Sequence, residues 1–280
     1  NLLSRCSAMC ADPSLDQRSV HAALCGTSNS AAGPDLLPGI FYHTLAKDLT
    51  RPLSIIFQQS YYSGVIPDMW RMASIMPVFK KGSRDVAANY RPVSLTSVAC
   101  KVMEGLIKQA MFSHLDDNSL LCRAQHGFSS KHSTSSSLLV SQYMYTRSVE
   151  NKCDVDVVMF DFAKAFDSVN HKLLLHKLIS YGFNNYLISW ITNFLSDRSQ
   201  SVKIGSKYSS VSSVPSGVIQ GSVIGPLLFV IFINDLPEVI RFSRAFLYAD
   251  DLKLCSAIKT VGDRLNMQVD IGAVADWANA

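Results

Sequence analysis

The sequence predicts an α+β fold, and three observations support this prediction. Phe246–Leu254 alternates apolar and polar residues around two adjacent acids, as expected for a β-hairpin with the acids at its tip. The near-continuous apolar run 155–162 is typical of a central strand that is buried on both faces. Residues 168–182 and 185–197 have the apolar spacing of two amphipathic helices.

Length and composition indicate a folded globular chain. Its 280 residues are enough for one large or two modest domains. With 48% hydrophobic and 17% charged residues the chain is not of the disordered class. The net charge of +4 is too small to establish a polyanionic partner by itself. The chain starts at Asn1 without a methionine and ends at Ala280 inside a predicted helix, so we expect a fragment of a longer protein.

The spacing of the cysteines raises the question of a zinc site. There are seven, an odd and scattered set that favours reduced thiols in an intracellular protein. Cys6 and Cys10 are four residues apart, as are His21 and Cys25, so each pair would share a helix face and is a candidate zinc site. Ordinary helical packing is the favoured alternative, because two-residue knuckles and flanking turn glycines are absent.

The first part of the chain predicts helices followed by a basic hairpin. Residues 1–35 are weakly patterned and end in a loop. Helices are expected over about 36–63, where leucines recur at helical spacing. A strand at 72–79 leads into the basic turn 80–84 and then into a second strand at 90–95. Two strands around a basic turn form a cationic hairpin.

A long helix and a turn follow the cationic hairpin. Thr96 or Ser97 is placed to cap a helix from Val98 to about Leu115. Gln125–Phe128 has the composition of a turn, and a serine- and threonine-rich loop comes after it. A helix is then expected over 134–149.

Beyond the amphipathic helices, short strands are expected at 202–204 and 209–211. The glycine-bounded loop 215–221 then leads into an apolar core helix at 223–233, a run too short to span a membrane. A final helix, which carries Trp277, follows the acidic hairpin.

Three carboxylates are expected to meet in this fold. Asp161 and Asp250 each stand at the end of an apolar strand, and Asp251 is next to the latter. Ionised acids repel one another at close range, and Lys253 is expected to point away from Asp251. Another part of the fold or a divalent cation must therefore offset their charge. A pair of Mg²⁺ ions would do so and would catalyse displacement at phosphorus. An exposed Asp-Asp turn without such a role is the alternative.

Chemistry at a triphosphate also requires cations on the outer phosphates. Lys80, Lys81 and Arg91 on the cationic hairpin are the candidates. A solvated charged turn is the alternative interpretation.

Several short motifs occur in a fixed order. They are Phe79-Lys80-Lys81-Gly82, Asn89–Leu95, Lys101 with Glu104, Gln125–Phe128, Phe160–Asp167, Gln220-Gly221-Ser222 followed by Gly225-Pro226-Leu227, and Tyr248–Asp251. The later motifs, in this order and spacing, resemble those of reverse transcriptases. The earlier ones resemble the polymerases of non-LTR, LINE-type retrotransposons. The resemblance covers residues 35–280.

The resemblance implies a right-hand polymerase fold. Fingers would occupy 36–150 and the palm 151–280, with an antiparallel palm sheet backed by helices. Residues 1–35 would be an N-terminal segment of uncertain order, and the thumb is expected to be absent. Trp277 resembles the aromatic residue of the helix before the last palm element.

The resemblance also implies roles for single residues. Asp161 and Asp250 would be the principal metal ligands and Asp251 the third acid, with the backbone carbonyl of Phe162 also facing the metal. Phe166 falls at the position of the steric gate, where a ring crowds a ribose 2′-hydroxyl and selects deoxynucleotides. A plain core aromatic is the alternative for Phe166.

The remaining roles concern the nucleotide. Lys80 or Lys81, together with Arg91, would grip the triphosphate, while Gln220 and Gly221 would line the nucleotide pocket. The alternative for Gln220 and Gly221 is a helix-entry turn.

The implied activity is that of an RNA-directed DNA polymerase, which extends a DNA primer on an RNA template from dNTPs with two Mg²⁺ ions, or with Mn²⁺. No membrane partner is expected. The implied location is the nucleus for target-site synthesis and the cytoplasm for particle assembly. Two alternatives stay open: an inactive fragment that only binds nucleic acid, and a group II intron-type reverse transcriptase. Asn89–Leu95 and Gln125–Phe128 disfavour the intron-type enzyme.

Overall fold

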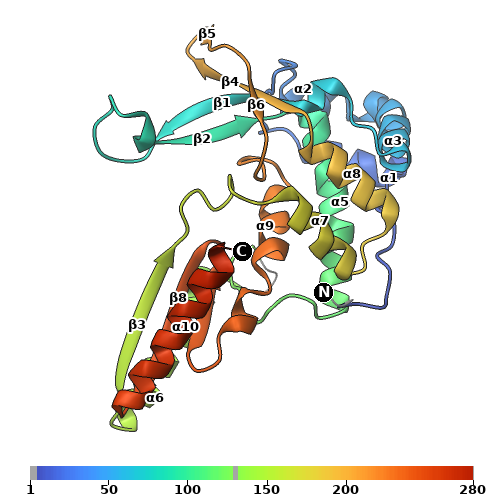
Figure 1. Cartoon of the computed structure of the whole chain (residues 1–280). Coiled ribbons are helices and arrows are strands. Elements are labelled where there is room, and N and C mark those ends of the chain that lie inside the picture. Colours follow the sequence, from blue (N-terminus) through green and yellow to red (C-terminus); the bar gives the residue numbers. More distant parts are fainter. Residues whose placement is uncertain (1–4, 129–131, 280) are drawn as a thin grey trace. The chain divides into compact units, whose positions relative to one another are not determined.

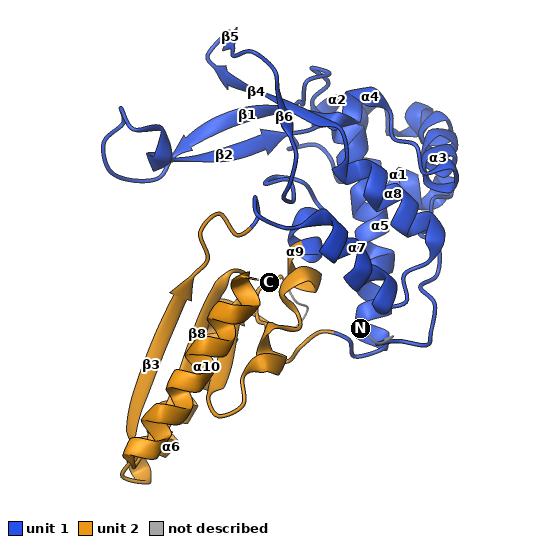
Figure 2. Cartoon of the chain, in the orientation of Figure 1, with its two compact units in different colours: residues 1–120, 166–228 blue, residues 121–165, 229–280 orange. Residues whose placement is uncertain are grey.

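The computed structural model describes residues 5–128 and 132–279. They form two compact units, each built from two stretches of the chain (Figure 2). Unit 1 comprises residues 1–120 and 166–228, and unit 2 comprises residues 121–165 and 229–280. Both units contain helices and strands, so the predicted α+β class is confirmed (Figure 1). The expected loop after Phe128 lies partly outside the described residues.

Most of the helices belong to unit 1. They are α1 (Gln17–Cys25), α2 (Gly39–Thr44), α3 (Ala46–Ser63), α4 (Asp68–Arg71), α5 (Val98–Asp117), α7 (His171–Ser180) and α8 (Asn185–Leu195), with a short 3₁₀ turn, η1 (Ala87–Asn89). The helical region expected over 36–63 is divided at Leu45. Ser97 takes the N-cap position of α5 as predicted, although its side chain makes no capping hydrogen bond. Cys6 and Cys10 lie in a non-helical segment, so the helical pairing expected for them is wrong.

Helix α5 and its neighbours supply the core of unit 1. Met103, Ile107 and Met111 recur at helical spacing on α5 and are completely buried. Trp190 and Phe194, one turn apart on α8, are also buried and stack at 5.1 Å between ring centroids. This spacing of apolar residues is what turns one face of each helix inward.

One sheet belongs to unit 1. Its strands are β1 (Met72–Phe79), β2 (Tyr90–Leu95), β4 (Arg198–Ile204), β5 (Lys207–Tyr208) and β6 (Ser212–Val214), in the order β2-β1-β4-β5 with β6 also paired to β4. The antiparallel β1–β2 pairing, which ends at Phe79 opposite Tyr90, confirms the predicted cationic hairpin. The strand expected at 209–211 is wrong, because those residues connect β5 to β6.

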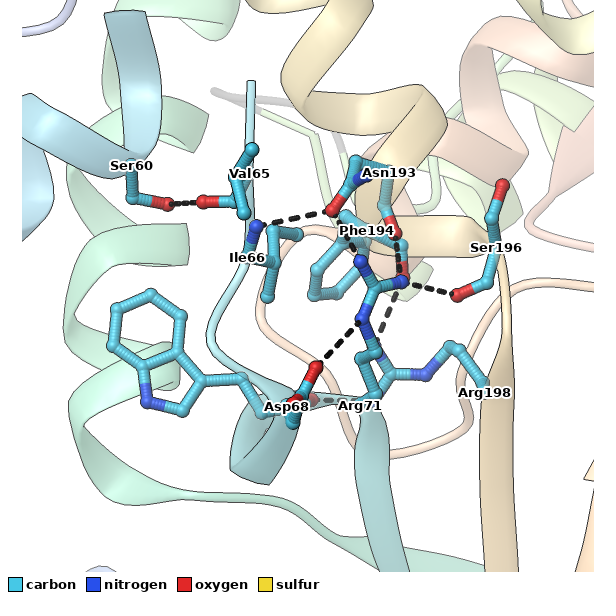
Figure 3. A network of polar contacts seen from close by, with 10 residues as sticks. Ser60, Val65, Ile66, Asp68, Arg71, Asn193, Phe194, Ser196 and Arg198 are labelled. Atoms are coloured by element: carbon cyan, nitrogen blue, oxygen red, sulfur yellow. Dashed lines mark hydrogen bonds and ion pairs between the residues drawn. The ribbon is translucent and has the colours of Figure 1, made fainter. Parts of the chain in front are cut away.

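Two arginines fix the parallel pairing of β1 with β4 (Figure 3). Arg71 donates to the carbonyls of Asn193 and Ser196 at 3.0 and 2.8 Å, and to the Asn193 side chain at 2.6 Å. Arg198 is buried and donates to the carbonyls of Phe194 and Trp70, both at 2.9 Å. These bonds satisfy the carbonyl groups at the end of α8 and hold the starts of both strands together.

Unit 2 is built on a three-stranded antiparallel sheet. Its elements are α6 (Thr134–Glu150), β3 (Asp154–Asp161), the 3₁₀ turn η2 (Leu236–Val239), β7 (Arg244–Tyr248), β8 (Asp251–Ile258) and α10 (Val261–Asn279). The strand order is β3-β8-β7. Helix α6 contacts β3 and β7, and α10 contacts β8.

The prediction of a central strand at 155–162 is therefore wrong. The strand is present as β3 but lies at the edge of the sheet, and Met159 on it is 78% exposed. Strand β8 is central, and Leu254 and Cys255 on it are completely buried. An apolar run indicates that a strand forms but does not by itself give its place in the sheet.

The chain passes between the units three times, the last time within α9 (Gly225–Ile233), the apolar helix predicted at 223–233. The helix expected at 168–182 begins later, at His171, because Asn170 is its N-cap. Among the helices that the structure describes, none is both long enough and apolar enough to cross a membrane.

Candidate functional site

The acidic hairpin of unit 2 has the predicted form. Strands β7 and β8 pair antiparallel, with Tyr248 opposite Asp251, so that only Ala249 and Asp250 form the turn. Ala249 takes a left-handed conformation, with φ at +54°. Such tight two-residue turns suit the twist of paired strands. The sequence therefore placed the two acids correctly at the tip of the hairpin.

Asp161 lies directly beside this tip. The β3–β8 register places Asp161 opposite Asp251 in the last pair of the ladder. Directly opposed residues in an antiparallel pair lie about 5 Å apart at Cβ, on the same face of the sheet. The expectation that the two strands are neighbours is confirmed, and Asp161 lies beside two acids that are distant from it in sequence.

The electrostatics reflect this crowding. Partial burial, together with the charges of Asp250 and Asp161, raises the pKa of Asp251 above its ordinary value. Among the described residues, no lysine or arginine forms an ion pair with any of the three acids. The carboxylates thus repel one another without a compensating basic group.

The expectation that Lys253 points away from Asp251 is wrong. It lies two residues after Asp251 on β8 and therefore on the same face of the sheet, not the opposite one. Its ammonium is drawn to the rings of Phe246 and Tyr145, at 5.2 and 5.6 Å from their centroids. These cation–π contacts hold the charge away from the acids.

The donor set suits a hard divalent cation. Carboxylate oxygens are the ligands that Mg²⁺ prefers, and a cation would remove the repulsion among Asp161, Asp250 and Asp251. Within the described residues, however, no three His, Cys, Asp or Glu side chains are arranged closely enough to hold a metal ion. The backbone brings the three positions together, but the side chains do not enclose a common point.

The residue after Asp161 is held by an aromatic cluster. The Phe162 ring lies 6.4 Å from that of Trp277 on α10, and Trp277 also contacts Phe232 at 6.2 Å. The Trp277 indole donates to Asp235 at 3.3 Å. Trp277 therefore packs beside the end of β3, while the role of the Phe162 carbonyl stays a prediction.

Unit 1 has a candidate region of its own, a turn that carries Gln220 and Gly221. The Ser94 amide of β2 donates to the Gln220 carbonyl at 2.8 Å. Gly221 has φ at +115°, and a β-carbon there would collide with the Ser94 carbonyl oxygen. Glycine is therefore required by the close approach of the chain to itself.

Phe166 and Asp167 lie under the same turn. The Val218 amide donates to the Phe166 carbonyl at 2.8 Å, and the Gln220 side chain donates to Asp167 at 3.0 Å. The structure thus brings Phe166, Gln220 and Gly221 into one local assembly, as the proposed nucleotide roles require. Phe166 is partly exposed rather than a fully buried core aromatic.

A pocket of ≈ 250 Å³ opens beside this assembly. Its polar lining comes from Ser94, Asp167, Arg198, Ser199, Gln200, Ser213, Ser216 and Gln220. Of the residues predicted to bind nucleotide, only Gln220 lines the pocket as the structure describes it.

The predicted phosphate-binding cations are spread along the β1–β2 hairpin. Arg91 is exposed on β2, opposite Val78, and Lys80 and Lys81 are exposed at the turn. At about 3.3 Å per strand residue, the turn lies roughly 15 Å from Ser94. The hairpin therefore brings Arg91 nearer to the Gln220 turn than either lysine.

Two buried polar residues that belong to the sequence motifs support backbone turns, a role that the sequence did not predict. Glu104 on α5 is completely buried and accepts from the amides of Val223 and Ile224 at 2.7 and 3.1 Å, just before α9. Burial raises the pKa of Glu104. Gln125 is 2% exposed and bonds to the turn of the acidic hairpin. The signal in the sequence for Glu104 was an acid within the apolar helix 98–115, whereas Gln125 had only its place in the motif Gln125–Phe128, because the partners of both residues are distant in sequence.

The family model and the relatives that match this chain are all reverse transcriptases or proteins of mobile elements. A family model described as reverse transcriptase (RNA-dependent DNA polymerase) matches residues 78–280. The chain is 29% identical over 257 residues to the RNA-directed DNA polymerase from mobile element jockey of Drosophila melanogaster, covering 89% of this chain and 28% of that protein. It is 30% identical over 210 residues to the probable RNA-directed DNA polymerase from transposon BS of the same species, covering 72% and 23%.

A third relative is the retrovirus-related Pol polyprotein from type-1 retrotransposable element R2 of Popillia japonica. The chain is 26% identical to it over 219 residues, which cover 78% of this chain and 29% of that protein. The chain thus spans less than a third of the length of these relatives.

Proposed function

The chain belongs to the reverse transcriptase family, and on this premise we propose that it is the polymerase core of a non-LTR retrotransposon protein. It would extend a DNA 3′-hydroxyl on an RNA template, with dNTPs as substrates. The observation that carries this proposal is the register that sets Asp161 opposite Asp251, at the tip formed with Asp250.

In this proposal the three acids hold divalent cations, with Mg²⁺ as the natural ion and Mn²⁺ as a substitute. Bound there, the cations would lower the pKa of the attacking hydroxyl and neutralise the charge of the triphosphate. Asp161 and Asp250 would be the principal ligands, with Asp251 as the third acid and the Phe162 carbonyl as a further oxygen donor. The protein itself would contribute mainly positioning, which is what phosphoryl-type transfer requires.

The nucleotide is proposed to lie against the Gln220 turn. Gln220 and Gly221 would line its pocket, and Phe166 would exclude a ribose 2′-hydroxyl. Arg91, with Lys80 or Lys81, would contact the triphosphate through charge-assisted hydrogen bonds. These roles rest on the family motifs and on the local contacts among Phe166, Gln220 and Gly221.

The same proposal assigns residues 36–150 to fingers and residues 151–280 to the palm. The antiparallel sheet of β3, β8 and β7, contacted by α6 and α10, supports the palm assignment. RNA template, DNA primer and dNTP are the proposed partners. Target-site synthesis would take place in the nucleus and particle assembly in the cytoplasm.

The test is dNTP incorporation on poly(rA)/oligo(dT) by the complete protein that contains residues 1–280. Asp250→Asn should lower incorporation at least about 100-fold, because a charge that binds the catalytic cation is removed. Asp276→Asn, an exposed acid on α10, is the matched control and should retain activity. Undiminished incorporation by Asp250→Asn would refute the assignment.

Nucleic-acid binding without catalysis is the second candidate, favoured by the exposed basic turn with Lys80 and Lys81. Binding that weakens steeply with salt, with no incorporation in Mg²⁺ or Mn²⁺, would establish it instead.

A further inference from the structure

Gln125 occupies an unusual position next to the acidic hairpin. The turn that contains it pairs with β7, since the Leu247 amide donates to the Ala124 carbonyl and the His126 amide to the Leu247 carbonyl, both at 2.8 Å. A β-carbon at Gly127 would collide with the Ala249 nitrogen, so the glycine permits the turn to approach the hairpin tip.

The Gln125 side chain bonds to both backbone groups of one residue. Its oxygen accepts from the Ala249 amide at 3.0 Å, and its nitrogen donates to the Ala249 carbonyl at 3.3 Å. The same oxygen accepts from the Gly127 amide at 2.7 Å. Gln125 and Ala249 are 2% and 7% exposed, so water does not replace these bonds readily.

Ala249 is the residue whose conformation sets the direction of the acids. It is left-handed, a conformation that is unfavourable for alanine, and it directly precedes Asp250 and Asp251. A carboxamide is the side chain that accepts from an amide and donates to a carbonyl at once. A carboxylate at this position would only accept, and would add a fourth negative charge near three acids.

We propose that Gln125 is a positioning residue: its amide fixes the backbone of the Ala249–Asp250 turn, and thereby sets how well Asp250 and Asp251 bind a divalent cation. This inference rests on the proposed function. Gln125 itself touches neither the cation nor the substrate, so its effect passes through the hairpin.

The first measurement is amide hydrogen exchange at Ala249, read by NMR in this chain. Gln125→Leu keeps the bulk of the side chain and removes both bonds to Ala249 as well as the bond from Gly127, so exchange at Ala249 should accelerate roughly 10- to 100-fold. Gln125→Glu keeps the acceptor and loses the donor, so its exchange rate should lie between those of Gln125→Leu and the wild type. Gln142→Ala, an exposed amide on α6 of the same unit, is the matched control and should leave Ala249 unchanged.

The second measurement is Mn²⁺ binding, followed by electron paramagnetic resonance. The Mn²⁺ concentration for half-saturation should rise about tenfold in Gln125→Leu. In the complete protein, kcat should fall while the KM for dNTP stays within about twofold of wild type, because the Gln220 turn is untouched. A purely structural role would instead accelerate exchange throughout unit 2.

The outcomes separate the two claims. A wild-type chain that binds no Mn²⁺, in a complete protein that incorporates no dNTP, overturns the proposed function and this inference with it. An active wild type with unchanged Ala249 exchange or unchanged Mn²⁺ affinity in Gln125→Leu overturns only the role of Gln125.

Discussion

Two sharp turns carry residues proposed to meet the substrate, and different chemistry holds each of them. In unit 1 the turn of Gln220 and Gly221 leads into α9, and the carboxyl group of Glu104 accepts from the amides of Val223 and Ile224 just before that helix. In unit 2 the turn of Ala249 and Asp250 carries acids, and the neutral side-chain amide of Gln125 supports it. This amide accepts a hydrogen bond from the Ala249 amide and donates one to the Ala249 carbonyl. Both supporting side chains are buried and come from distant segments.

The difference follows from the charge that each turn already bears. The start of a helix exposes amide donors that need an acceptor, so a side chain that only accepts is sufficient there. The hairpin tip bears two acids and lies beside a third, so a further negative charge there would be unfavourable. An amide satisfies both backbone groups of Ala249 without adding charge.

The largest change in the free energy of unfolding is expected for a substitution at Gly221, in the turn of unit 1. Gly221→Ala places a methyl group against the Ser94 carbonyl in a conformation that alanine rarely adopts, and should lower the free energy of unfolding by at least about 3 kcal/mol. Chemical denaturation measures this loss. Gly105→Ala, in open space on α5, is the control and should be neutral or stabilising by up to about 1 kcal/mol. Equal effects at Gly221 and Gly105 would contradict the account of this turn.

Glu104→Ala should cost about 2–4 kcal/mol, because the buried amides of Val223 and Ile224 lose their acceptor. Glu104→Gln keeps an acceptor oxygen and should cost less. Asp117→Asn, an exposed acid on the same helix, should leave the denaturation midpoint unchanged. A Glu104→Ala variant as stable as Asp117→Asn would show that the carboxylate does not hold the turn.

The protonation of Glu104 adds a pH dependence to this comparison. Burial raises its pKa above the ordinary 4.5, so the folded state binds the proton more tightly than the unfolded state. Its contribution to stability should be greatest below pH 4.5 and decline as the pH rises through the raised pKa. Glu104→Gln should remove this decline, which denaturation over a pH series measures.

The smallest change in the free energy of unfolding is expected for a substitution at Ala249. Ala249→Gly relieves the left-handed strain but increases the freedom of the unfolded chain, and these terms nearly cancel to within about 1 kcal/mol. The midpoint of denaturation should therefore stay close to that of the wild type. A loss as large as that of Gly221→Ala would mean that packing of the Ala249 methyl group, rather than hydrogen bonding, holds this turn.

The sequence was sufficient for features that depend on local pattern. Alternation around Asp250 and Asp251 predicted the hairpin, and the basic turn at Lys80 predicted the cationic hairpin. It was insufficient where partners are distant. The edge position of β3 depends on which strands pair with β8, and the local sequence pattern of a strand does not indicate its partners.

The supporting residues show the same limit. The partners of Glu104 are more than 100 residues away, and so are those of Gln125 on the acidic hairpin. Lys253 is a different case, because the two-residue period of a strand already places it on the same face as Asp251, so the expectation that it points away was wrong on the sequence alone.

The central claim is that Asp161 and the hairpin tip form one cation site. Mn²⁺ titration of this chain, followed by electron paramagnetic resonance, tests it most directly, with Asp154→Asn at the other end of β3 as the matched control. We expect Asp161→Asn to weaken Mn²⁺ binding at least about tenfold and Asp154→Asn to leave it unchanged. Equal Mn²⁺ affinity in Asp161→Asn and the wild type would contradict the claim.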